Sequence, residues 1–141
     1  MKGDVIPDAD HVARYCPASC VEENEIQPTA FRLRRPQETY LSVNWLESLK
    51  LQNRVDEVAA LQKILATKLT IGSRARIAVL NVGNTRAHVR GQSPNNHNLP
   101  VLHEPEDADP SHSGIHDIDL DNETMISELI AQTVLEAHPA K

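Results

Sequence analysis

The segment 103–121, HEPEDADPSHSGIHDIDLD, concentrates the residue types that are best able to do chemistry. It holds three of the chain's seven histidines among seven acidic residues. Imidazoles and carboxylates at this density can supply a general acid and base or hold a divalent cation. We therefore take His103, His112 and Glu104 as catalytic candidates. Because the histidine spacings match no established ligand motif, no metal ligand is assigned, and a surface role or partner recognition stays open.

The motifs of well-known enzyme classes are missing from the sequence. No serine stands in a GxSxG context, and the single glycine of NVGNT falls far short of a nucleotide-binding loop. Pro105 would break the helix on which an HExxH zinc motif depends. Cys16 and Cys20 lack the CxxC spacing and cannot complete a four-ligand zinc site alone, so we expect reduced thiols. We expect no resident cofactor.

Three further residues are candidates for binding rather than catalysis. Arg32 and Arg34 lie in a predicted hairpin, where guanidinium groups can hold a phosphate or a carboxylate. The alternative is that they simply face solvent. Trp45 lies at the predicted junction of a strand and a helix, where it serves either as a core anchor or as a hot spot for a partner.

The charge of the chain is unevenly distributed. The formal net charge is −6, and eight acids without a lysine or arginine fall within residues 104–123. Residues 63–103 hold six lysines and arginines and no acid. Such blocks are usually solvated surface, but they also suit pairing with each other or docking with a charged partner. Nucleic acid is disfavoured as the main partner because the chain as a whole would be repelled by phosphates.

The elements that must position these residues can be predicted from apolar patterning and caps. Strands are expected at residues 11–16, at 30–34 and 39–43 as a hairpin, at 76–82 as a central strand covered on both faces, and at 99–105. Helices are expected after a cap at Asn44, from Asn53 through Lys68, and from Asp121 to about Ala137, with at most a turn at NTRAHV.

These elements predict an α+β fold for a single domain of residues 1–141, with residues 1–9 as a loose N-terminal lead-in. We expect a small, mostly antiparallel sheet of four or five strands with two main helices packed on one face. No apolar run approaches the roughly 20 residues that span a bilayer, and the first residues lack the apolar core of a signal peptide. A cytoplasmic location without membrane contact is therefore expected.

Four blocks of the sequence resemble, in this order, a group of small uncharacterised bacterial proteins. They are HVARYC, AFRLRRPQETYLSVNWLE, AVLNVGNTRAHV and HEPEDADPSH, and together they span roughly residues 11–138. The group carries no established activity, so the resemblance transfers no catalytic residue, but it links the chain to variable accessory gene clusters that include defence-type ones. It also implies that the four blocks form one domain, in which these polar residues could meet: His11, Arg14, Glu47, His103 and His112.

Two functions of different classes follow from the sequence. The first is a non-catalytic partner-binding or regulatory accessory protein of a bacterial system, because recognised catalytic motifs are missing and separated charge blocks suit docking. Its partner would be a protein, with a second copy of the chain also a candidate. The alternative is a small hydrolase or nuclease that depends on the histidines and acids of segment 103–121, with or without a metal.

Overall fold

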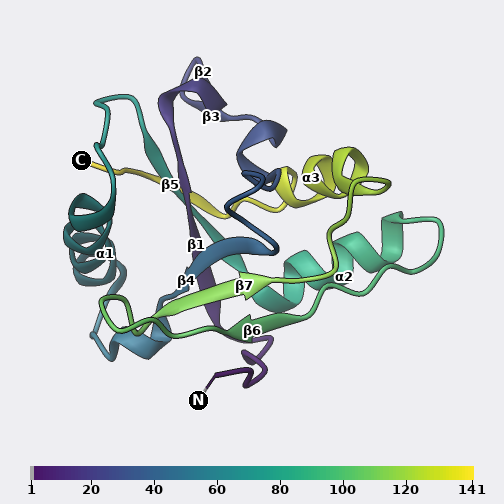
Figure 1. Ribbon diagram of the computed structural model, residues 1–141, viewed down its shortest axis with the longest axis horizontal. Helices are drawn as coiled ribbons and strands as arrows, with labels where there is room; N and C mark the ends of the chain where they lie inside the picture. Colours follow the sequence, from purple (N-terminus) through teal and green to yellow (C-terminus); the bar gives the residue numbers. More distant parts are fainter. Residues whose placement is uncertain (1) are drawn as a thin grey trace.

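The structure is a computed structural model that describes residues 2–141, so Met1 of the predicted lead-in lies outside the described residues. Within this range six strands form one antiparallel sheet in the order β6-β7-β4-β1-β5-β8 (Figure 1). These strands are β1 (His11–Cys16), β4 (Leu41–Trp45), β5 (Arg76–Asn81), β6 (Val101–His103), β7 (His112–Ile115) and β8 (Glu136–Pro139). A separate small sheet consists of β2 (Val21–Glu22) and β3 (Glu25–Ile26).

Helices cover both faces of the main sheet. The described residues contain α1 (Arg54–Lys68), α2 (Val82–Gln92), α3 (Glu123–Ala131) and the 3-10 turns η1 (Ala18–Cys20), η2 (Pro28–Phe31) and η3 (Glu47–Leu49). Figure 1 shows α1 and the α2–α3 pair on opposite sides of the sheet. The predicted α+β class is therefore confirmed, whereas the placement of the main helices on one face is wrong. No helix within residues 2–141 is long and apolar enough to cross a membrane.

Strand β5 explains why two covering layers are needed. Its apolar residues alternate between the faces, as successive strand residues must. Ile77 and Val79 join the core beneath α1, while Ala78 and Leu80 join the core beneath α2 and α3. All four are fully buried, as predicted for a central strand. A single helical layer would leave one of these apolar faces in water.

The C-terminal helix is shorter than its sequence pattern predicts. Helix α3 ends at Ala131, and the chain then enters β8 instead of continuing to Ala137. Strand β8 pairs with β5, with Ala137 opposite Ala78. Without β8 the outer backbone groups of β5 would lack partners, and this need outweighs the local helical pattern. The sheet has six strands, not the four or five expected, because the sequence pattern predicts neither β7 nor β8 and the predicted strand at residues 30–34 is not part of it.

Three further local predictions are corrected by tertiary packing. Residues 30–34 are not a strand, because Phe31 closes the turn η2 and is fully buried beneath α3. Asn44 lies inside β4 and does not cap a helix. The NTRAHV segment belongs to the full helix α2, whose cap is the side chain of Asn81. In contrast, the predicted helix after Asn53 is confirmed, with the Asn53 side chain accepting a hydrogen bond from Asp56.

The α1 face of the sheet changes character halfway across. Over β1 and β5 this face is apolar and covered by the Leu61 and Leu65 side chains of α1. The corresponding positions of β4 and β7 are instead polar: Ser42, Asn44 and His112. The outer edge of the same half is closed by residues 3–6 of the lead-in, which hydrogen-bond along β6. The polar half of the sheet is the place where a site can form.

Candidate functional site

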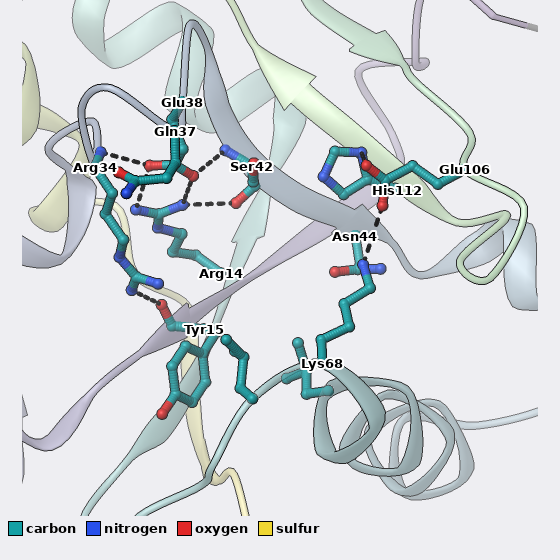
Figure 2. A pocket seen from close by; sticks show the side chains of 12 residues that line it. Arg14, Tyr15, Arg34, Gln37, Glu38, Ser42, Asn44, Lys68, Glu106 and His112 are labelled. Atoms are coloured by element: carbon teal, nitrogen blue, oxygen red, sulfur yellow. Dashed lines mark hydrogen bonds and ion pairs between the residues drawn. The ribbon is translucent and has the colours of Figure 1, made fainter.

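A cavity of about 520 Å³ lies between the C-terminal end of α1 and the polar half of the sheet. We call it the polar cavity, and Figure 2 shows the side chains around it. The loop at residues 34–38 closes one end, and the β6–β7 loop at residues 104–111 contributes to the other. Its twelve lining residues are Arg14, Tyr15, Arg34, Gln37, Glu38, Ser42, Asn44, Leu65, Lys68, Leu69, Glu106 and His112.

A buried ion pair fixes the β6–β7 loop against α1. The Asp109 carboxylate is fully buried and accepts hydrogen bonds from Lys68 Nζ at 2.6 Å, Asn44 Nδ2 at 2.9 Å and Ser111 Oγ at 3.0 Å. Burial alone would raise the pKa of Asp109, but Lys68 and Asn44 outweigh it and hold this pKa below its ordinary value. Burial would likewise lower the pKa of Lys68, but Asp109 and Glu106 raise it overall. The pair therefore stays charged and is poorly suited to exchanging protons.

A second ion pair fills a gap between β1 and β4. The paired register of these strands runs only as far as Ala13 opposite Asn44. Beyond it, the Arg14 guanidinium donates to the Ser42 carbonyl at 2.9 Å, and the Glu38 carboxylate accepts from the Ser42 amide at 3.1 Å. Arg14 and Glu38 bind each other at 2.8 Å, and Arg14 is only 2% exposed. This side-chain pair thus supplies the hydrogen bonds that a neighbouring strand would give.

Two arginines, Arg14 and Arg34, lie near the Glu38 carboxylate, and Arg14 is the one that forms an ion pair with it. Burial would raise the pKa of Glu38, but Arg14 outweighs this and lowers it, so the carboxylate is ionised. Arg34 lies beside this pair, donates to the Tyr15 carbonyl at 3.2 Å and stands over the Tyr15 ring, 5.5 Å from its centroid. Within residues 2–141 no carboxylate lies within ion-pair distance of Arg34. Burial, and then repulsion from Arg14, lower the pKa of Arg34.

His112 presents one ring nitrogen to the polar cavity. Its Nδ1 lies 3.0 Å from the Glu104 carbonyl oxygen, which can only accept, so Nδ1 is the donor. The neutral ring therefore carries its lone pair on Nε2. Figure 2 shows this second nitrogen turned toward the space in front of Ser42. The ring stands near Tyr40, whose centroid is 6.0 Å away, and the imidazole is held in one orientation.

The structure separates the three catalytic candidates. His103 pairs with Ser113, so its side chain lies on the opposite face of the sheet from that of His112. The His103 ring packs edge-on against Trp45 at 5.2 Å, and its Nε2 contacts the Pro110 carbonyl. The Glu104 carboxylate binds His116 at 2.8 Å. Of the three candidates, only His112 lines the polar cavity.

The three binding candidates, Arg32, Arg34 and Trp45, are also divided, as are His11 and Arg14, which the four-block resemblance added. Arg14 and Arg34 line the polar cavity. His11 binds Glu47 at 2.7 Å, and the Trp45 indole donates to Asp10 at 2.9 Å, both away from the cavity lining. The Arg32 side chain lines none of it either, and its buried Nε has no hydrogen-bond partner.

Sequence reasoning missed the residues that complete the cavity. The sequence predicts Asn44 as a helix cap, and it places Lys68 only at the end of a predicted helix and within a basic stretch. Glu38 lies in a polar turn and Asp109 in an acidic run, so neither position stands out locally. The DP dipeptide at Asp109 is a turn signal, but only the folded chain shows that its carboxylate is buried.

The described part of the chain, residues 2–141, contains no group of three histidine, cysteine, aspartate or glutamate side chains placed to hold a metal ion. Comparisons with known protein families, with curated protein sequences and with solved structures found no match. The function is therefore inferred from the polar cavity itself.

Proposed function

We propose that the protein is a non-catalytic partner-binding or regulatory accessory protein, and that the polar cavity is its binding site. The observation that carries this proposal is the pairing of the carboxylates that line the cavity. Glu38 binds Arg14, and Glu106 shares Lys68 with the buried Asp109. Because these cations lower the pKa of Glu38 and of Asp109, both carboxylates are poor proton donors and acceptors for catalysis.

The same ion pairs make the cavity a rigid recognition surface. Lys68 and Asp109 connect α1 to the β6–β7 loop, and Glu38 connects the 34–38 loop to β1 through Arg14 and to β4 through the Ser42 amide. A preformed site avoids the entropic cost of ordering loops when a ligand binds. A volume of about 520 Å³ lies within the ordinary range for bound ligands and would also hold a side chain of a protein partner. The four-block resemblance favours a partner encoded in a bacterial accessory or defence-type system.

Affinity isolation from cells of the source organism tests this proposal. Leu69 lies at the rim of the cavity and is 39% exposed, so Leu69→Trp should obstruct it without disturbing the core. Val55→Trp is the matched control, because Val55 is 77% exposed and does not line the cavity. We expect the wild type and Val55→Trp to recover the same stoichiometric protein partner and Leu69→Trp to lose it. Recovery of only the free monomer at low salt, or equal recovery by both variants, would refute the proposal.

A second candidate function is a small hydrolase or nuclease in which His112 acts as the general base. One observation favours it: the Glu104 carbonyl fixes the His112 tautomer with the Nε2 lone pair toward the cavity. Hydrolysis of a panel of phosphodiester, ester and amide substrates tests it, with His112→Phe as the variant. Turnover that the wild type shows and His112→Phe abolishes would favour the enzyme over the binding protein.

A further inference from the structure

We propose that the polar cavity recognises a carboxylate of the partner at Arg34 and, at its other end, a hydrogen-bond donor of the partner at His112 and Asn44. The inference rests on the proposed partner-binding function. It assigns the chemistry of the bound segment, which is a stretch of polypeptide that offers one carboxylate together with peptide N–H groups.

The carboxylate end is defined by Arg34, whose side chain forms no ion pair with any carboxylate of the described residues 2–141. Arg14 and Arg34 lie close enough to repel each other, and the nearby Glu38 carboxylate forms its ion pair with Arg14. The Arg34 side chain donates one hydrogen bond, to the Tyr15 carbonyl, which leaves most of its five N–H donors available. A half-buried guanidinium beside another cation gains from an incoming anion, and its planar fork matches a carboxylate.

The charge of the whole lining favours one negative charge over two. Three cations line the cavity, Arg14, Arg34 and Lys68, together with the carboxylates Glu38 and Glu106. The buried Asp109 lies directly behind Lys68 at 2.6 Å and balances it further. A dianionic phosphate would therefore meet repulsion that a single carboxylate at Arg34 largely avoids.

The opposite end presents acceptors. Asn44 Nδ2 donates to Asp109 and Ser111, which fixes the orientation of the amide and leaves Oδ1 as an acceptor. Figure 2 shows this oxygen turned toward the open space, as is the second ring nitrogen of His112. Both groups are buried in the sheet, so a ligand that enters must bring donors to them. Backbone N–H groups of a polypeptide meet this need.

The wall between the two ends is apolar. Leu65 and Leu69 of the α1 end and the ring of Tyr15 line it. The aliphatic part of a glutamate side chain, or the Cα and Cβ of a C-terminal residue, would contact this wall while the carboxylate reached Arg34. An acidic side chain and a free C-terminus offer the same chemistry, so the experiment must separate them.

The test is an NMR titration of the full-length, isotopically labelled protein with three peptides. N-acetyl-Gly-Glu-Gly-amide carries the side-chain carboxylate only, N-acetyl-Gly-Gly-Gly carries the C-terminal carboxylate only, and N-acetyl-Gly-Gln-Gly-amide carries neither. We expect saturable shifts at Arg34 and His112 with one of the two acidic peptides and none with the glutamine peptide. The peptide that binds identifies the source of the carboxylate.

Two variants and one control tie the binding to the assigned groups. Arg34→Gln should lower the affinity for the acidic peptide roughly tenfold to a hundredfold, which corresponds to the usual free energy of a charge-assisted hydrogen bond. Arg74→Gln is the control, because Arg74 is exposed and lies outside the cavity, and it should leave the affinity unchanged. His112→Phe keeps an aromatic ring beside Tyr40 but removes the acceptor, so it should weaken binding as well. Thermal unfolding of each variant verifies that it is folded.

Three results would overturn the assignment. They are equal binding of the acidic and glutamine peptides, no saturable binding of either acidic peptide at millimolar concentration, and an Arg34→Gln affinity equal to that of Arg74→Gln. If one of these is found while Leu69→Trp still loses the cellular partner, partner binding at the cavity stands and only the carboxylate chemistry is wrong. If Leu69→Trp retains the partner, the proposed function itself fails.

Discussion

Replacing Lys68 by methionine should lower the free energy of unfolding, because the buried Asp109 carboxylate would lose its counter-ion. Removing one member of a buried ion pair typically costs about 3–5 kcal/mol of unfolding free energy. Here the Lys68 side chain is 30% exposed, and Asp109 keeps hydrogen bonds from Asn44 and Ser111. We therefore expect a loss of about 2–3 kcal/mol at neutral pH, below the typical value. Urea unfolding followed by circular dichroism measures it, with the exposed Lys63→Met as the control, for which we expect a change within about 0.5 kcal/mol.

The pH dependence of this loss identifies its cause. In the wild type the folded pKa of Asp109 is lowered, so its contribution is fully present above about pH 4 and is lost as the pH falls through the folded pKa. Without Lys68, the effect of burial is dominant and raises the pKa of Asp109. Lowering the pH then protonates this carboxylate and removes the destabilisation that its unpaired charge causes in the variant. The stability difference between wild type and Lys68→Met should shrink from about pH 7 to about pH 5. A difference that is constant over this range, or no larger than that of Lys63→Met, would refute the reasoning.

Three further outcomes are expected. Arg14→Met leaves the Glu38 carboxylate, whose side chain is only 10% exposed, without its counter-ion, so urea unfolding should show a loss of about 3–5 kcal/mol of unfolding free energy, and a loss below about 1 kcal/mol would contradict the assigned role. A Cβ at Gly114 would overlap the ring of Tyr40, so Gly114→Ala should cost roughly 1–3 kcal/mol in the same assay, whereas an unchanged midpoint would show that the ring moves freely. Burial raises the pKa of the Cys16 thiol to about 12, so in the folded protein at mildly alkaline pH a thiol reagent should label Cys20 alone, and labelling of both at equal rates would contradict this.

Much of the fold could be predicted where the pattern of one segment decides its structure. The apolar run at residues 76–82 forms the interior strand β5, which is buried on both faces, and α1 begins at the predicted cap Asn53. Prediction failed where a distant partner decides. The apolar stripe of the last helix runs on to Ala137, but the open edge of β5 draws residues 136–139 into a strand. The sequence pattern of residues 121–139 carries no information about the unpaired edge of β5, which lies far away in the chain.

The candidate site shows the same division. Residue type pointed to segment 103–121, and one of its histidines does line the cavity. The β6–β7 register decides which histidine lines the cavity. His103 pairs with Ser113, and His112, which is adjacent to Ser113 in β7, faces the opposite side of the sheet from His103. Asn44, which the sequence predicts as a helix cap, instead lies in β4, and the β4–β7 register places it opposite His112 in the cavity lining. The pairing of Arg14 with Glu38 joins segments 24 positions apart and follows from the gap between two strands, which the sequence does not display.

Site-specific photo-crosslinking at the rim of the polar cavity tests the central claim most directly. Gln37 lines the cavity and is exposed, whereas Gln52 is exposed but lies outside it. A benzophenone amino acid would be placed at each position in turn and irradiated in cells of the source organism. The account predicts a discrete adduct with one protein partner from position 37 and none from position 52. An adduct from position 52 alone, or no adduct from position 37, would contradict it.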